Sequence, residues 1–387
     1  MSTQALASRL PILDLTRQYE QLRPQMEEAV LSVMASGTFI LGPNVKAFEA
    51  EVAEYLGATQ AIGVASGTDA LYLALKALGI GPGDEVITTA FSYIATSESI
   101  ERAGATPVFV DLDPSGTFNL NASAIELKLT ERTKAILPVH LYGQSARMDV
   151  ILEVARKHQL YIVEDCAQAF GAEWQGQKVG TLGDLGCYSF FPSKNLGCYG
   201  DGGLVTAQDP VLAEKVRVLR QHGSVQKYHH TVEGGANSRL DELQAAILRI
   251  KLPHIDNWNR ERLANAQRYS QLLSQIPGIR VPHILDEGRH VFHQYTLSVD
   301  PQQAGLNRDQ LQQKLDAEGI MTMIYYPVPL HRQGIHQHLG YTEGSLPLTE
   351  MEARQVLSLP MFPELQEAEI QRVSNAIRQA VEEARQP

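Results

Sequence analysis

Lys194 lies in surroundings that favour a reactive amine. It belongs to the segment Tyr188-Ser-Phe-Phe-Pro-Ser-Lys194-Asn195, which follows a predicted strand and is otherwise apolar or small. A lysine withdrawn from water loses its charge readily, and its neutral amine can form a Schiff base with a carbonyl group. A solvated surface lysine is the ordinary alternative. The glycine-rich run from Gly197 to Gly203 lacks the GxGxxG spacing of a strand-to-helix turn, so a dinucleotide site is disfavoured.

An acid and an amide lie at the end of another predicted strand, in Val163-Glu-Asp165-Cys-Ala-Gln168. In parallel α/β sheets, ligands lie outside the carboxyl ends of the strands, which is where Asp165 is expected. A carboxylate there could pair with a protonated pyridine nitrogen and keep such a ring electron-withdrawing. Its alternative role is to cap the following helix.

Two further segments could bind the other parts of a planar, phosphorylated ligand. Ser66-Gly67-Thr68-Asp-Ala follows a predicted strand and opens a helix over 71–78. Backbone N–H groups at such a helix start bind phosphate, although Ser and Thr are also common helix caps. Tyr93 begins the helix after the next strand and could either stack on a planar ring or belong to the core.

The spacing of apolar residues predicts an α/β fold with an N-terminal helical lead over 16–35 and 43–56. Short β-rich runs then alternate with helix-length segments, which indicates a mostly parallel sheet; the runs are 61–65, 85–89, 106–110, 135–139 and 161–164. Two more runs, 186–191 and 203–207, lie too close together for a helix between them, so a hairpin-like excursion is predicted.

A helical pattern over 239–274, broken by Pro253, leads to the C-terminal part. There we expect strands at 295–299 and 321–326 and helices at 308–318 and 364–384. The predicted organisation is a large domain over residues 1–250 and a smaller α/β domain over residues 251–387.

Composition disfavours several other classes of protein. A net charge of -11 and a pI near 5.6 argue against nucleic acid or anionic lipid as a partner, because both require a basic face. Cys166, Cys187 and Cys198 form no CxxC pair, so no disulfide framework or zinc knuckle is indicated and a reducing cytoplasm is expected. No window approaches the roughly 18 apolar residues of a membrane span. We therefore expect a soluble, cytoplasmic protein.

Three histidines near the C-terminus raise the question of a metal. His331, His336 and His338 lie close together in the sequence, and imidazoles at short spacing are common metal ligands. No acid or cysteine completes a convincing ligand set. We therefore expect no metal and interpret these residues as surface or pocket histidines.

Four motifs occur together along the chain: SGTDA from Ser66, EDCAQAFGA from Glu164, SFFPSKNLGCYGDGG from Ser189 and GANSRLDELQAA from Gly235. In their order and spacing they resemble the sugar aminotransferases of the DegT/DnrJ/EryC1/StrS family. The resemblance covers nearly the whole chain. It implies fold type I of the enzymes that use pyridoxal 5′-phosphate (PLP), with pyridoxamine 5′-phosphate as the form that carries the nitrogen.

The resemblance also implies how the cofactor is bound. Lys194 would hold it as a Schiff base and later move the proton, Asp165 would pair with the pyridine nitrogen, and Gln168 would lie near the phenolic oxygen. The remaining contacts would be to the phosphate, from Gly67, Thr68 and Ser189, and to the ring face, from Tyr93.

Other matching positions imply a second subunit and a sugar pocket. Asn237 would reach the phosphate of the neighbouring subunit's cofactor, which implies a homodimer with shared active sites. Arg239, Tyr325 and Tyr326 match positions that line the sugar pocket, and His230 is a further candidate for binding the substrate.

Within the family, Tyr228-His-His230 and Ile324-Tyr-Tyr-Pro-Val-Pro-Leu-His331 look most like enzymes that aminate a UDP-linked 3-keto-N-acetylglucosaminuronate. The implied reaction moves an amino group from L-glutamate to a nucleotide-linked keto sugar for lipopolysaccharide or polysaccharide synthesis. That subfamily has histidine where this chain has Tyr325, which argues against a uronate carboxylate as ligand.

Three alternatives to this reaction remain open. The acceptor could be a dTDP-linked 3- or 4-keto-deoxysugar. A dehydratase of the same fold is a second alternative, but in those relatives a histidine replaces the lysine found here as Lys194. The third is a regulatory homologue that binds the cofactor without turnover.

Overall fold

The computed structural model describes residues 9–386 and is built on a seven-stranded sheet of order β1-β9-β8-β5-β4-β2-β3. The pairs from β8 to β3 are parallel, whereas β9 is antiparallel to both of its neighbours. This confirms the predicted α/β fold with a mostly parallel sheet. The strands are β1 (Gln60–Val64), β2 (Glu85–Thr89), β3 (Thr106–Val110), β4 (Thr133–Leu137), β5 (Tyr161–Asp165), β8 (Leu185–Ser189) and β9 (Gly203–Ala207).

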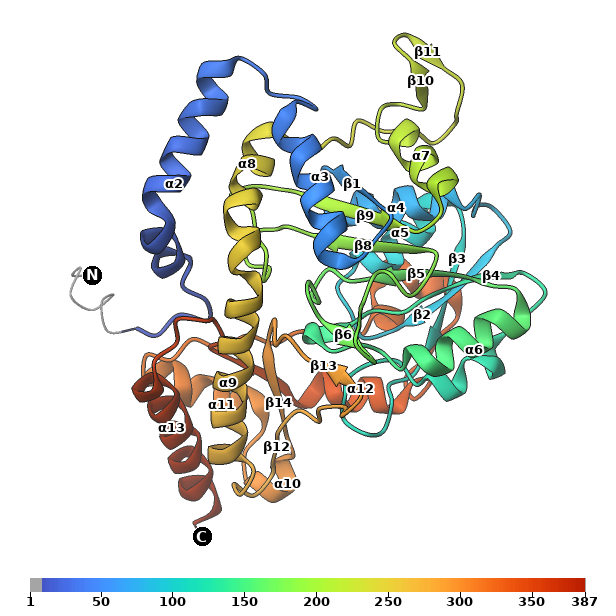
Figure 1. Ribbon diagram of the computed structural model, residues 1–387. Coiled ribbons are helices and arrows are strands. Elements are labelled where there is room, and N and C mark those ends of the chain that lie inside the picture. The colour runs from blue at the N-terminus through green and yellow to red at the C-terminus, as the bar shows by residue number, and fades with distance from the viewer. Residues whose placement is uncertain (1–8, 387) are drawn as a thin grey trace.

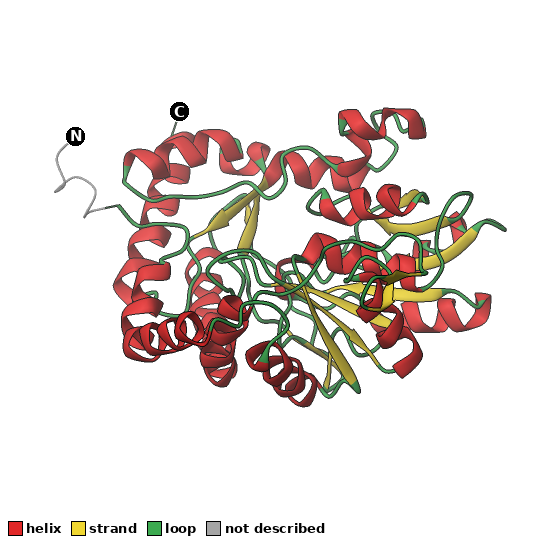
Figure 2. Ribbon diagram, turned by 90° about the horizontal axis from the view of Figure 1, so that it is seen from above, coloured by secondary structure: helices red, strands yellow, loops and turns green. Residues whose placement is uncertain are grey.

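Alternate residues of the strands face different cores. On β1, Ile62 and Val64 join a core that includes α4 and α7, whereas Ala61 joins a core that includes α2, α3 and α8. A period of two is what a strand buried on both faces requires. Figure 2 shows helices on both sides of the fan of strands. The helices of this part are α2 (Leu15–Ser36), α3 (Pro43–Leu56), α4 (Gly67–Ala77), α5 (Ala95–Ala103), α6 (Met148–His158), α7 (Pro210–Leu219) and α8 (Glu242–Lys251).

Strands β8 and β9 form the expected hairpin-like excursion. They pair antiparallel from Leu185 opposite Ala207 to Ser189 opposite Gly203. Beyond the last pair, the Phe190 N–H donates to the Gly202 carbonyl at 2.8 Å. The segment between these two residues leaves the sheet and carries Lys194, so the lysine is held by a closed loop.

Helix α4 begins earlier than its apolar pattern predicts. The pattern indicated a start at Leu71, but the helix starts at Gly67. Its N-cap is Ser66, whose hydroxyl accepts a hydrogen bond from the Asp69 N–H at 3.1 Å. The spacing of apolar residues cannot detect polar residues in the first turn of a helix, which explains why the predicted start was too late.

The C-terminal part is organised around a second, three-stranded sheet of order β12-β14-β15. The predicted strand at 295–299 is confirmed as β14, and its own core includes Tyr295, Leu297 and Phe362. The elements are α9 (Ile255–Leu273), β12 (Ile279–Arg280), β14 (Tyr295–Val299), α10 (Pro301–Ala304), α11 (Arg308–Ala317), α12 (Pro347–Gln355), β15 (Val356–Leu359) and α13 (Glu367–Arg385).

The expected strand at 321–326 is wrong. That segment makes one isolated bridge, from Met323 to Ser358, and the third strand is β15 instead. Pro327 and Pro329 follow the segment and cannot donate to a ladder, which prevents extended pairing there. The segment instead carries Tyr325 and Tyr326 toward the large sheet, where they pack against its core.

Helices α8 and α9 connect the two sheets in one long column (Figure 1). The predicted break at Pro253 is a single 3₁₀ turn over Leu252–His254. Helix α8 packs against α2 and α3, whereas α9 packs against α13. We retain residue 250, beside this turn, as our proposed domain boundary.

Two small sheets complete the description. One joins β13 (Gly288–Arg289), β6 (Glu173–Trp174) and β7 (Gln177–Lys178), and the other is the hairpin of β10 (Ser224–Gln226) and β11 (His229–His230). Figure 1 shows this hairpin projecting beyond α7. Among residues 9–386, no helix has the length and apolar character needed to cross a membrane.

Candidate active site

A cavity of about 610 Å³ lies at the carboxyl ends of the parallel strands. Its wall comes from the loops after β1, β2, β5 and β8 and from two segments of the C-terminal half. Nine of the residues predicted from the sequence line it, namely Gly67, Thr68, Tyr93, Asp165, Gln168, Ser189, Lys194, Tyr325 and Tyr326.

Asp165 ends β5 and is held by two hydrogen bonds. Its carboxylate accepts from the Thr96 hydroxyl at 2.9 Å and from the Ala167 N–H at 3.1 Å. Burial raises the pKa of the Asp165 carboxyl above its ordinary value, although these two bonds oppose the shift. A cationic group in the cavity would favour the carboxylate again, so the residue is suited to a protonated ligand nitrogen.

Lys194 presents an amine that is easily deprotonated. Burial lowers the pKa of its ammonium to about 8, and the negative charge of Asp165 opposes that shift. Within residues 9–386, the Lys194 Nζ atom makes no hydrogen bond, and the side chain lines the cavity. The arrangement leaves the nitrogen free to attack a carbonyl carbon.

The start of α4 meets the end of β8 at very short range. A Cβ atom on Gly67 would lie 2.7 Å from the Cβ atom of Ser189, so only glycine allows this contact. Gly203 similarly faces the Ser66 carbonyl, to which a Cβ would lie 2.3 Å away. The close approach brings the first-turn N–H groups of α4 and the Ser189 hydroxyl to one end of the cavity, where an anion would be favoured.

Gln168 is oriented by two neighbours. Its side-chain oxygen accepts from the Tyr142 N–H at 2.7 Å, which directs its amide NH₂ to the Tyr326 hydroxyl at 2.9 Å. The Tyr142 hydroxyl in turn donates to the Tyr325 carbonyl. Tyr93 lies opposite, with its ring centroid 6.4 Å from that of Tyr326 and 59% of the residue exposed. Tyr93, Tyr325 and Tyr326 therefore form an aromatic wall of the cavity.

Three predicted residues lie outside the cavity of their own chain. His230 is exposed on the projecting hairpin, and Asn237 is exposed where it bridges to Gln221. Arg239 is half-buried, and its Nε atom is buried without a hydrogen-bond partner among residues 9–386.

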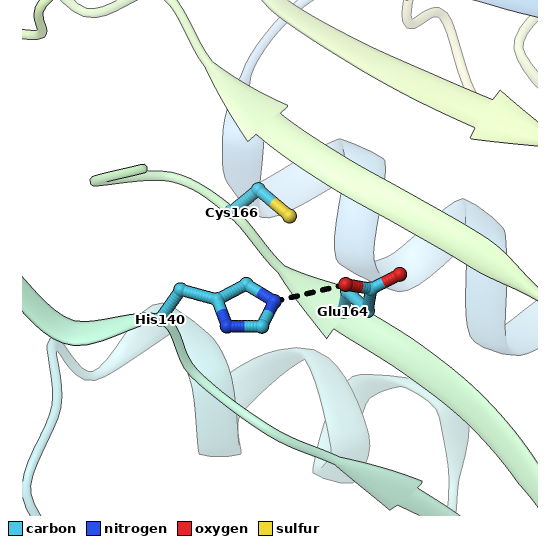
Figure 3. A group of neighbouring side chains, drawn as sticks. All are labelled: His140, Glu164 and Cys166. Atoms are coloured by element: carbon cyan, nitrogen blue, oxygen red, sulfur yellow. Dashed lines mark hydrogen bonds and ion pairs between the residues drawn. The ribbon is translucent and has the colours of Figure 1, made fainter. Parts of the chain in front are cut away.

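A buried network behind Asp165 escaped the sequence analysis. The Glu164 carboxylate accepts from the N–H groups of Gly180, Leu182 and Gly183 at 2.7 to 2.8 Å, and it is 3.0 Å from His140 Nε2 (Figure 3). The His140 Nδ1 atom accepts from a backbone N–H at 3.0 Å, so the ring proton lies on Nε2 and is donated to Glu164.

The network resembles a metal site only in composition. Ligand atoms of His140, Glu164 and Cys166 lie within 4.8 Å of one another (Figure 3). Both nitrogens of His140 are already used, and burial raises the pKa of the Cys166 thiol well above its ordinary value, which keeps the thiol protonated. The group therefore supports the end of β5 rather than a cation.

The three C-terminal histidines are dispersed. His331 faces Glu350 with 3.1 Å between Nε2 and the carboxylate, and His336 lies between Glu101 at 3.1 Å and the Ser97 hydroxyl at 2.8 Å. His338 is exposed. His336 and His338 share the Glu101 carboxylate, with His338 Nε2 3.4 Å from it, whereas His331 contacts Glu350, so the three side chains do not converge on one carboxylate.

The overall fold is shared with an enzyme captured during its reaction. The crystal structure of Streptomyces venezuelae DesV in complex with a ketimine intermediate matches with a TM-score of 0.92 and 47% identity, over 98% of this chain and 99% of that one. The fold and the cavity together define a PLP-dependent aminotransferase of fold type I. The chain belongs to the DegT/DnrJ/EryC1/StrS aminotransferase family, whose model matches residues 20–378.

Named relatives cover almost the entire chain. A pleiotropic regulatory protein of Geobacillus stearothermophilus is 52% identical over 95% of this chain and 97% of its own. A dTDP-3-amino-3,4,6-trideoxy-α-D-glucose transaminase of Streptomyces venezuelae is 47% identical over 99% of both chains. A UDP-N-acetyl-3-dehydro-α-D-glucosamine 3-aminotransferase of Acidithiobacillus ferrooxidans is 47% identical over 96% of this chain and 98% of its own. The protein is thus a sugar aminotransferase.

The residues of the cavity fit PLP chemically. The cavity offers an unpaired amine for the aldehyde, a carboxyl for the ring nitrogen, and backbone N–H and hydroxyl groups for the phosphate.

Replacing Glu164 with glutamine should destabilise the fold by about 2–4 kcal/mol, because an amide NH₂ would then face backbone N–H donors in a buried site. Urea unfolding measures the loss. Glu126→Gln is the matched control, since Glu126 is a solvent-exposed acid that pairs with Lys157 and His158, and it should lose less than about 1 kcal/mol. Equal losses would contradict the supporting role of Glu164.

Replacing Lys194 with methionine should change how stability depends on pH. The folded-state pKa of about 8 lies below the ordinary 10.5, so the unfolded chain binds the extra proton between these values. The stability of the cofactor-free wild type should therefore rise across that window relative to Lys194→Met. Below about pH 8 the wild type should carry the full penalty, on the order of a few kcal/mol. Thermal unfolding from pH 7 to 10.5 measures this, with exposed Lys46→Met as the control.

Proposed function

We propose that the protein transfers an amino group from L-glutamate to C3 of a UDP-linked 3-keto sugar, as a step in polysaccharide or lipopolysaccharide synthesis. One observation carries the proposal: the Lys194 amine, which has no hydrogen-bond partner, and the Asp165 carboxyl line the same cavity. The two groups have the chemistry needed at opposite ends of a pyridine aldehyde.

We assign the other contacts of the cofactor by the same logic. Gly67, Thr68 and Ser189 hold the phosphate through N–H and hydroxyl donors at the start of α4. Tyr93 covers the ring, and Gln168 donates to its phenolic oxygen from the orientation that Tyr142 fixes. When bound, PLP supplies an aldehyde that takes up nitrogen and a ring that withdraws electrons.

The protein's own part in the reaction is to hold and move protons. Asp165 keeps a proton on the ring nitrogen, because a buried carboxylate is stabilised by a cation next to it. Lys194 takes a proton from one carbon and returns it to another, for which an amine with a pKa near the working pH is suited. The aromatic wall of Tyr93, Tyr325 and Tyr326 limits the access of water to this transfer.

We further propose that the active unit is a homodimer. Asn237, Arg239 and His230 would serve the partner's active site, since they lie outside the cavity of their own chain. The exposure of Asn237 and His230 supports this proposal, because both side chains are accessible to a second subunit. Exposed apolar residues on and after α2 support it too; they are Leu31, Met34, Phe39 and Ile40.

C3 is our preferred position of amination because two relatives with different nucleotides are both named for a 3-amino or 3-dehydro sugar. Tyr325 and Tyr326 line the cavity and carry no positive charge that would pair with a uronate carboxylate, which suits a neutral sugar better. A dTDP-linked keto sugar is the second candidate, favoured by the Streptomyces relative at 47% identity.

A regulatory role without turnover is favoured by the name of the Geobacillus relative. The chain retains the lysine and the acid that transamination needs, so we infer that catalysis is its function.

The acceptor can be identified by direct assay. Purified enzyme is incubated with glutamate and a panel of UDP- and dTDP-linked 3-keto and 4-keto sugars, and the aminated products are identified by mass spectrometry. We expect a UDP-linked 3-keto sugar to give the highest kcat/KM. Amination of 4-keto acceptors alone would overturn the C3 assignment. The absence of a borohydride-trapped adduct at Lys194 would overturn the function itself.

Replacing Asp165 with alanine should slow single-turnover amino transfer by about 100-fold to 1,000-fold, because the ring nitrogen loses its counter-charge. Gln168→Ala should cost only about 10-fold, because it removes one neutral hydrogen bond. Stopped-flow absorbance with glutamate measures both variants. Equal rates would contradict the ranking.

A further inference from the structure

The loop that carries Lys194 is attached to the column of α8 and α9 (Figure 1). The Asn195 amide NH₂ donates to the Asn259 side-chain oxygen on α9 at 2.8 Å. The Tyr199 N–H donates to the Gln244 side-chain oxygen on α8 at 2.9 Å. The loop is therefore held from both sides of the 3₁₀ turn that separates the two helices.

The central attachment of the loop is Lys251, the last residue of α8. Its Nζ atom donates to the Gly197 carbonyl at 2.7 Å and lies 4.2 Å from the centroid of the Tyr199 ring. Lys251 and Gln244 are about two helical turns apart, so their side chains project from the same face of α8. The loop is thus attached at residues 195, 197 and 199, which is every second residue after Lys194.

The Lys251 ammonium is buried without a counter-ion. The residue is 1% exposed, and no carboxylate among residues 9–386 forms an ion pair with it. Burial lowers the pKa of Lys251 to about 8, and nearby Cys198 and Glu364 oppose that shift. A buried ammonium is costly unless its surroundings compensate for the lost water. A carbonyl and an aromatic ring compensate here, so the contacts that keep this charge in the core also fix the loop.

The fixed carbonyl belongs to the same tight turn as Lys194. A Cβ atom on Gly197 would lie 2.4 Å from the Pro192 carbonyl oxygen, so the chain after Lys194 packs against the chain before it. The Lys194 N–H donates to the Phe191 carbonyl at 2.8 Å within that turn. A displacement of Gly197 would therefore move the backbone of Lys194 as well.

We propose that Lys251 is a positioning residue for the amino transfer, which holds the Gly197 carbonyl so that the loop presents the Lys194 amine in one place. The inference rests on the proposed role of Lys194. Lys251 does not line the cavity, so it acts through the loop alone. A loop without this contact would hold the amine in the reactive place for only part of the time, and the apparent affinity for PLP would fall by that fraction.

The hold on the loop can be measured in the full-length protein without cofactor. Hydrogen exchange of the segment 191–202, followed by mass spectrometry, reports how often its hydrogen bonds open. Lys251→Met keeps most of the volume but removes a charged donor, so exchange of this segment should become about 10-fold to 100-fold faster. Lys215→Met is the matched control, because exposed Lys215 on α7 also donates to a carbonyl, that of Ala77 at 3.3 Å. It should leave the segment unchanged.

The effect on Lys194 is measured by binding of PLP. Cofactor-free protein is titrated with PLP, and the adduct at Lys194 is trapped with borohydride and quantified by mass spectrometry. The apparent Kd should rise by about 10-fold in Lys251→Met and by less than about two-fold in Lys215→Met. Lys251→Gln keeps an amide donor without the charge and should raise the Kd by about three-fold. It serves as the test variant if Lys251→Met does not fold.

A merely structural role for Lys251 would lower the midpoint of urea unfolding but leave loop exchange and PLP affinity of the folded variant at wild-type values. That result would overturn the inference. An adduct that forms with equal affinity in the wild type and the Lys251 variant rejects the role of Lys251 alone. The absence of an adduct in the wild type rejects the proposed function, and the role of Lys251 with it.

Discussion

The buried carboxylate of Glu164 is the contact on which the geometry of the site depends. It gathers three N–H groups from the turn before β8 and the imidazole of His140 after β4, so three neighbouring chain segments meet at one acid. Asp165 is the next residue, and β8 leads directly to the loop of Lys194. A charge in the interior is costly unless it is fully hydrogen-bonded, and here each donor is supplied by backbone or by a fixed tautomer.

The lining of the cavity suits an anion without relying on basic side chains. Among its lining residues, Lys194 is the only lysine or arginine, and burial makes its amine easy to deprotonate. In a chain of net charge -11, we propose that the N–H groups at the start of α4 and nearby hydroxyls would hold a phosphate. This is possible because glycines at 67 and 203 let α4, β8 and β9 approach closely enough for those donors to converge.

Sequence reasoning found nine residues that line the cavity but missed the residues that support them. Lys194, Asp165 and Gln168 could be predicted because each ends or follows a predicted strand and belongs to one of the four motifs. Glu164 and His140 looked like ordinary strand and loop residues, because only tertiary packing brings the N–H donors and the imidazole to the buried carboxylate. The strand expected at 321–326 failed for a related reason, since local β propensity there yields to the prolines that follow and to the packing of two tyrosines.

The loop that carries Lys194 is closed at its neck and braced along its length. Phe190 bonds to Gly202, Cys198 bonds back to Phe190, and the buried Lys251 ammonium donates to the Gly197 carbonyl at 2.7 Å. An incoming cofactor would thus meet a loop that is already ordered, and it would lose little of its binding free energy to ordering that loop. Saturation by vitamin B6 should then depend on its concentration rather than on refolding of this loop.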